Sequence, residues 1–303
     1  MAPAMKLALG PVLYYWPRET LTAFYAAIAD AQVDIVYLGE QVCSRRHEMR
    51  LEDWLGIADL LAECGKEVVL SSQALLESEG YLKLLRQLVA NGCFRVEAND
   101  MSAVRLLAGR PGWVAGLHLN VYNPQTLALL AELGAKRWVA PVELTRQALA
   151  GVLASRPAGV EAEALAYGRL PLALSARCFT ARHFNLQKES CDYRCGDFPD
   201  GLPLNTGEGA PFLVLNGIQT QSARVYFLLQ ELPALREMGV NVLRASPHSQ
   251  NMPAVLAALR ACCDGTISPG ETLDELAPLM PEAPCNGFWH GRAGLEQDFS
   301  RAS

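Results

Sequence analysis

The chain has 303 residues, half of them hydrophobic, with 19% charged residues and a formal net charge of −6. This length suits one large domain or two small ones. The acidic balance gives no reason to expect nucleic-acid binding, which usually shows as a basic patch or stripe. No run of eighteen apolar residues occurs, so we expect no membrane span. The first sixteen residues lack the pattern of a cleaved leader, and we expect a cytoplasmic location.

Short apolar, β-branched runs recur along the chain at intervals of roughly twenty to thirty residues. Such runs fit strands that are buried on both faces of a sheet. In chain order, the predicted strands cover residues 6–13, 34–38, 67–71, 94–97, 113–118, 137–142, 161–166, 212–216 and 240–245.

The segments between these runs carry apolar residues at helical spacing. Leu21, Phe24, Tyr25 and Ile28 form one such stripe, and comparable stripes start at Trp54, Tyr81 and Leu127. Sustained alternation of strand and helix indicates an α/β protein with a parallel sheet. The length and the number of repeats favour a TIM-barrel-like (β/α)₈ fold over residues 1–303, with a doubly wound open sheet as the alternative.

Residues 167–211 interrupt this rhythm. The stretch is rich in Gly, Pro, Asp and Asn and holds three of the nine cysteines. We interpret it as a Cys-containing insertion that follows a late barrel strand. A loop of this length in a compact domain is usually functional.

Four cysteines stand out by their positions. Cys178, Cys191 and Cys195 lie in the insertion with the spacing C-x₁₂-C-x₃-C, and Cys43 follows the second predicted strand. Segments that follow the strands of a parallel barrel share one face, so Cys43 can meet the insertion. Four thiolates suit a [4Fe–4S] cluster, a [2Fe–2S] cluster or structural zinc. Neighbouring arginines, among them Arg45 and Arg46, would favour the thiolate forms.

Polar residues also occupy predicted strand ends, where barrel enzymes keep their chemistry. They are Glu40, Glu97, Asn99, His118, Asn120, Glu143, Asn216 and Gln219. Glu143, Asn120 and His118 are the candidates for a catalytic role. The chain has no G-x-S-x-G nucleophile elbow and no P-loop, and HEMRL at 47–51 lacks the second histidine of the zincin motif.

Several segments are similar to a known family. LGPVLYYWPRETL, VDIVYLGEQVCSRR, ALAYGRLPLALSARCFTARH, ESCDYRC and FLVLNGIQT resemble the UbiV family, which belongs to the larger collagenase-like peptidase family. The similarity runs from about Met5 to Leu295. GEQVCSRR and SARCFTAR are its most specific pieces.

The resemblance implies a [4Fe–4S] cluster on Cys43, Cys178, Cys191 and Cys195, because all four family cysteines are present in order. It also implies a heterodimer with a UbiU-like paralogous subunit and an accessory lipid-binding protein. Together they would hydroxylate the ring of a ubiquinone precursor under anaerobic conditions, with prephenate as the oxygen donor. By this reading the chain is one part of a heterodimeric enzyme and no peptidase.

Two other functions stay open at the level of the sequence. The wider family name points to a collagenase-like peptidase, although no motif supplies a nucleophile or a hydrolytic metal. The third possibility is a non-catalytic scaffold in which a metal only staples the insertion, since structural metals can contribute folding energy outright.

Overall fold

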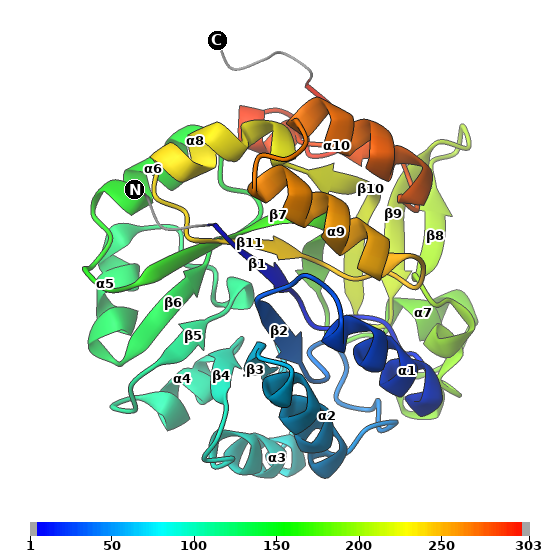
Figure 1. Cartoon of the computed structure of the whole chain (residues 1–303). Coiled ribbons are helices and arrows are strands. Elements are labelled where there is room, and N and C mark those ends of the chain that lie inside the picture. Colours follow the sequence, from blue (N-terminus) through cyan, green and yellow to red (C-terminus); the bar gives the residue numbers. More distant parts are fainter. Residues whose placement is uncertain (1–4, 299–303) are drawn as a thin grey trace.

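A computed structural model describes residues 5–298 of the chain. Eight parallel strands form a closed barrel at its centre (Figure 1). They are β1 (Lys6–Leu9), β2 (Ile35–Leu38), β3 (Glu67–Ser71), β4 (Arg95–Ala98), β5 (Trp113–Ala115), β6 (Ala135–Val139), β7 (Glu161–Leu174) and β11 (Val242–Ala245).

The barrel closes through β11, which pairs with β1 on one side and with β7 on the other. Leu7 lies opposite Leu243 in the first pairing, and Ala164 lies opposite Leu243 in the second. An open doubly wound sheet would leave two free edges at these strands. The predicted (β/α)₈ fold class is therefore confirmed, and the doubly wound alternative is wrong.

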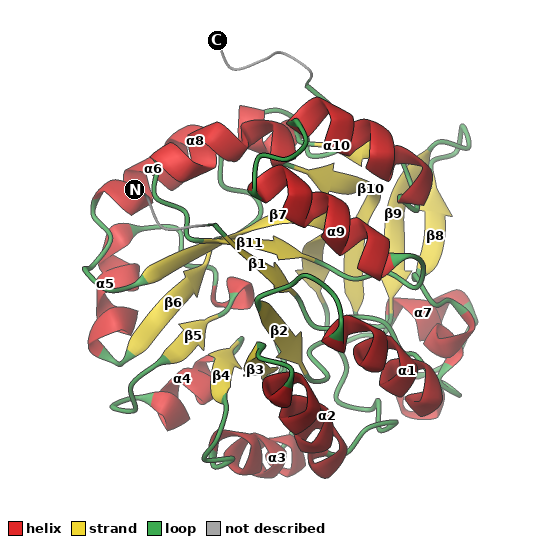
Figure 2. Cartoon of the chain, in the orientation of Figure 1, coloured by secondary structure: helices red, strands yellow, loops and turns green. Residues whose placement is uncertain are grey.

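Helices surround the barrel (Figure 2). They are α1 (Arg18–Ala29), α2 (Leu51–Glu63), α3 (Glu79–Val89), α4 (Met101–Leu107), α5 (Pro124–Glu132), α6 (Arg146–Ala154), α7 (Phe179–His183), α8 (Leu232–Glu237), α9 (Met252–Cys263) and α10 (Pro269–Leu276). The stripes expected from the sequence face inward: Leu21, Tyr25 and Ile28 of α1 are buried. Their burial against the strands supplies the main driving force for the fold.

The insertion is attached to an unusually long seventh strand. β7 continues to Leu174, so residues 167–174 of the predicted insertion are strand and only the residues beyond them leave the barrel. Beyond α7, β8 (Leu202–Asn205), β9 (Pro211–Asn216) and β10 (Gln219–Phe227) form an antiparallel extension. β10 pairs with the outer half of β7 and with β12 (Pro284–Cys285). The predicted strand 212–216 is thus β9, which lies outside the barrel.

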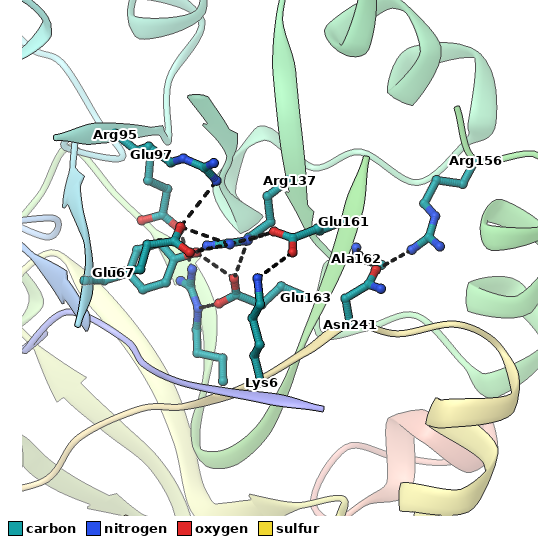
Figure 3. Close-up of polar contacts among 12 residues, drawn as sticks. Lys6, Glu67, Arg95, Glu97, Arg137, Arg156, Glu161, Ala162, Glu163 and Asn241 are labelled. Carbon is teal, nitrogen blue, oxygen red and sulfur yellow. Dashed lines mark hydrogen bonds and ion pairs between the residues drawn. The ribbon is translucent and has the colours of Figure 1, made fainter. Parts of the chain in front are cut away.

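Charged side chains fill part of the barrel interior (Figure 3). Arg244 donates from Nε to Glu163 at 2.5 Å and from Nη2 to Glu97 at 2.8 Å, and all three residues are buried. Arg137 bonds to Glu161 at 2.6 Å near the amino-terminal ends of the strands. Because isolated charges are costly to bury, each of these groups depends on its partners.

Among residues 5–298, no helix is both long enough and apolar enough to cross a membrane.

Candidate metal centre

The four singled-out cysteines lie at the carboxyl-terminal end of the barrel strands, where three of them, Cys43, Cys178 and Cys191, pack around one apolar cluster. Cys43 lies in the loop after β2, and the other three lie in the insertion after β7, with β11 and β1 between those two strands. Cys43 and Cys178 are buried in one apolar cluster, and Cys191 packs against it. Chain folding therefore joins residues that are 135 positions apart in the sequence.

The loop that carries Cys43 is shaped by its own first residues. Gly39 has φ +126°, and a Cβ added there would stand 2.7 Å from the carbonyl oxygen of Ser71. Only glycine accepts this conformation and this close approach. Oε1 of Glu40 then accepts the backbone N–H groups of Val42 and Cys43 at 2.9 and 3.0 Å. The carboxylate thus fixes the turn that presents Cys43.

Cys178 caps the short helix α7. Its sulfur accepts the backbone N–H of Ala181 at 3.3 Å. The N–H of Phe179 donates to the carbonyl of Gly217 at 2.8 Å, and the hydroxyl of Thr180 accepts the N–H of Gly217 at 3.0 Å. These bonds fasten the Cys178 segment to the turn between β9 and β10.

Cys191 and Cys195 flank a tight turn. Between them, Asp192 and Tyr193 both adopt left-handed backbone conformations, with φ of 48° and 50°. Two consecutive non-glycine residues in this region are uncommon and store strain, a feature that clusters at functional sites. The turn brings both thiols of the C-x₃-C pair toward the loop after β2, and Arg45 donates from Nη2 to the carbonyl of Glu189 at 2.7 Å.

A buried arginine joins the two cysteine-bearing segments. The side chain of Arg46 is only 2% exposed. Its Nη1 donates to the carbonyl of Leu13 and its Nη2 to Oδ1 of Asn216, both at 2.7 Å. The carboxylate of Glu40 lies 3.6 Å from Nη1. A fixed positive charge therefore stands beside the thiols.

The pKa values of the thiols report the same arrangement. Burial raises the pKa of Cys43, Cys178 and Cys195, and the positive charge of Arg46 works against that rise at Cys43 and Cys195. Cys43 and Cys191 raise the pKa of Cys178 further, and Cys178 does the same to Cys195. Each of the four thiols thus interacts electrostatically with at least one of the others. Metal binding would displace their protons.

The donor chemistry fits an iron–sulfur cluster. Four thiols with buried apolar neighbours and a nearby guanidinium form the donor set, and thiolates are the ligands of Fe–S clusters and of structural zinc. Within the part of the chain that the structure describes, no three His, Cys, Asp or Glu side chains stand close enough together to hold one metal ion. The four cysteines would hold the group, with Arg46 offsetting its negative charge.

The three catalytic candidates lie elsewhere on the same rim. His118 belongs to the turn after β5, and its Nε2 is buried without a hydrogen-bond partner among residues 5–298. Asn120 and Glu143 are exposed, and the hydroxyl of Tyr122 donates to Glu143 at 3.0 Å. The structure does not bring these three residues together with the cysteines. Their catalytic role stays a prediction.

The other polar residues at strand ends divide into two groups. Glu40 and Asn216 take part in the cysteine site, whereas Glu97 and Asn99 are buried in the barrel mouth, where Nδ2 of Asn99 donates to Glu97 at 3.1 Å. Gln219 lies beside Asn216, whose Nδ2 donates to it at 3.3 Å.

Sequence reasoning missed one polar pair at this end of the barrel. The hydroxyl of Tyr167 lies 3.0 Å from Nε2 of His248, and both residues are buried. His248 follows β11 just as Cys43 follows β2. This position after the eighth barrel strand is the sequence feature that could have identified it.

The remaining cysteines lie away from the site. Cys262, Cys263 and Cys285 are buried in α9 and β12. The apolar stripe that contains Trp54, Ile57 and Leu61 predicts that Cys64 lies in the core. This prediction is wrong, because α2 ends at Glu63 and Cys64 is exposed.

A family model described as Peptidase family U32 matches residues 17–297, which is most of the chain. The chain belongs to peptidase family U32. The match covers both cysteine-bearing segments of the U32 barrel, and it confirms the wider collagenase-like family to which the sequence is similar.

Solved structures with a similar fold are distant from this U32 protein. Dihydrodipicolinate synthase DapA-2 from Bacillus anthracis matches with a TM-score of 0.49 and 8% identity over 91% of this chain and 81% of that chain. Tryptophan synthase from Pyrococcus furiosus matches with a TM-score of 0.44 and 7% identity, over 90% of this chain and 98% of that chain. Type I 3-dehydroquinate dehydratase from Clostridium difficile matches with a TM-score of 0.43 and 10% identity, over 87% of this chain and 94% of that chain. None of these likenesses bears on the reaction of this chain.

Proposed function

We propose that this chain is a UbiV-type iron–sulfur subunit that supports oxygen-independent ring hydroxylation in ubiquinone biosynthesis. The observation that supports the proposal is the packing of Cys43, Cys178 and Cys191 around one apolar cluster, with Cys195 next to Arg46 beside it. The partners are a UbiU-like paralogous subunit and an accessory lipid-binding protein, and the oxygen donor is prephenate.

The chain's own residues have defined tasks in this proposal. The four thiolates hold a [4Fe–4S] cluster, which when bound would supply one-electron transfer. Arg46 offsets the negative charge of the site, and its two 2.7 Å bonds tie the loop after β2 to Leu13 and to Asn216 at the end of β9. Val42 and Ile218, each 1% exposed, shield Cys43 and Cys178 from water. Lower solvent exposure is one of the levers on cluster potential.

Membership of the U32 family also supports a second candidate, a collagenase-like peptidase. This function would need an activated nucleophile or a hydrolytic metal. A scaffold stapled by its metal is the third candidate. Both make predictions that differ from those of the redox subunit.

The test is anaerobic growth of a host that lacks its own oxygen-independent hydroxylation system, with this chain co-expressed with its paralogous partner. Ubiquinone content is the readout. Wild type and Cys64→Ala, which removes an exposed thiol far from the site, should restore ubiquinone, and Cys191→Ala should not. The proposal fails if Cys191→Ala restores ubiquinone as well as wild type. Peptide cleavage by the purified protein would favour the peptidase, and a bound metal without a redox couple would favour the scaffold.

A further inference from the structure

A cavity of about 680 Å³ is lined by residues of α2, of α3 and of the loop that carries Cys43. We call it the α2–α3 cavity. The two helices are neighbours at the side of the barrel (Figure 1). Its volume lies in the range of small-molecule sites, which is roughly 300–1,000 Å³.

The walls of the α2–α3 cavity are mostly apolar. Trp54 and Leu55 contribute from α2, and Tyr81, Leu84 and Leu88 contribute from α3. Leu84 is 49% exposed, so it marks the rim. Two aromatic rings among these residues offer faces and edges against which a ring can pack.

Polar groups come to the cavity from the ends of β2 and β3. Ser71 and Ser72 are buried there, and Glu40 and Arg46 approach from the Cys43 loop. Nε of Arg46 is buried without a hydrogen-bond partner among the described residues. Hydrogen-bond donors and acceptors therefore meet at one end, which would orient a molecule with a polar head and an apolar body.

Buried polar and charged side chains fill the barrel mouth. Glu97, Asn99 and Arg244 occupy it, and each is at most 3% exposed. Their side chains bond to one another and fill the volume in which many barrel enzymes bind substrate. The α2–α3 cavity lies to the side of this mouth, beside the loop that carries Cys43.

We infer that the α2–α3 cavity binds a hydroxylated aromatic ring that carries an apolar chain, with the hydroxyl group at the Ser71–Arg46 end. This inference rests on the proposed function, because it assigns a binding site to the class of substrate that the proposed function requires. The Cys43 loop borders the cavity, because Glu40, Ser44 and Arg46, on either side of Cys43 in the sequence, line it. The apolar chain leaves along Leu84 toward solvent or a lipid-carrying partner.

The test is calorimetric titration of the anaerobically purified full-length protein with 4-hexylphenol, with phenol and hexan-1-ol as probes that lack the chain or the ring. Wild type should bind 4-hexylphenol more tightly than either fragment. Leu84→Glu should weaken that binding about tenfold, because a charge replaces apolar surface at the rim. Leu129→Glu changes a leucine that is 53% exposed on α5, away from the cavity, and should bind like wild type.

Absence of 4-hexylphenol binding to wild type, or equal affinities of Leu84→Glu and Leu129→Glu, would overturn the inference. Circular dichroism checks that both variants are folded, and both substitutions fall on exposed helix positions. Iron is counted in the same samples. Bound iron without phenol binding would defeat this inference alone, and phenol binding without iron would support it while counting against the proposed function.

Discussion

Nη2 of Arg46 donates to Oδ1 of Asn216 at 2.7 Å, across 170 residues of sequence. This bond joins the loop after β2 to the turn after β9, and Gly217 in that turn holds the Cys178 helix. The two segments that carry the cysteines are thus tied together by a contact that uses no cysteine.

Asn216→Ala should lower the free energy of unfolding by about 2 kcal/mol, because Nη2 of buried Arg46 loses its acceptor. Urea denaturation followed by circular dichroism measures this loss. Gln125→Ala, at an exposed position on α5, is the matched control and should change stability by less than about 0.5 kcal/mol. Equal stabilities of the two variants would show that the bridge contributes nothing.

Gly39→Ala should destabilise the protein by at least about 2 kcal/mol, because φ of +126° is strained for alanine and its Cβ would meet the Ser71 carbonyl. Gly56→Ala is the opposite case. Gly56 lies in the middle of α2 with open space around it, so alanine should raise stability by about 0.5–1 kcal/mol. Thermal unfolding of the two variants should shift in opposite directions, and a harmless Gly39→Ala would contradict the shape of the Cys43 loop.

Glu163→Gln should lower the free energy of unfolding by about 3–5 kcal/mol, because Arg244 and Arg137 would remain buried with less compensating charge. Glu79→Gln removes a carboxylate from an exposed pair with Arg86 and should cost less than about 1 kcal/mol. Guanidinium denaturation of both variants measures the contrast. Similar small losses would mean that the barrel charges are solvated.

Stability should fall as the pH drops from about 6.5 toward 4, in part because of His118. Burial lowers the pKa of this histidine from 6.5 to about 4, so the unfolded chain binds a proton in this window that the folded chain does not. Between pH 7.5 and pH 5.0 the loss from this residue is about 2 kcal/mol. His118→Gln should therefore lose about 2 kcal/mol less than wild type over the same interval in urea denaturation. Identical pH dependence in both proteins would contradict the burial of the ring.

Periodicity and spacing predict much of this fold but less of the site. The buried strands and amphipathic helices can be predicted because apolar residues recur at the spacing of one face of a strand or helix. The same pattern also allowed an open sheet, so the pairing of β11 with both β1 and β7 had to come from the structure. β9 was predicted as a strand, whereas β8 and β10 were not. β10, QTQSARVYF, buries polar residues such as Gln221 and Ser222 in hydrogen bonds. A polar sequence of this kind does not distinguish a buried strand from a loop.

The sequence indicates which cysteines form the candidate site, but it does not reveal the hydrogen bonds that hold their segments in place. Strand order places Cys43 on the same barrel face as the insertion, and the structure packs Cys43 with Cys178 and Cys191. The four-cysteine ligand set stays a prediction. The bonds from Arg46 to Asn216 and from Phe179 to Gly217 depend on the turn between β9 and β10, which no local pattern reveals. Cys64 is exposed although it continues an apolar helical stripe, because such a stripe does not show where the helix ends.

The most direct test of the central claim is the content of iron and acid-labile sulfide in anaerobically purified protein, for wild type, Cys43→Ala and Cys64→Ala. Wild type and Cys64→Ala should carry about four iron and four sulfide per chain, and Cys43→Ala should lose most of both. Colourless wild-type protein with one zinc per chain, or a Cys43→Ala protein that keeps its full iron content, would contradict the account.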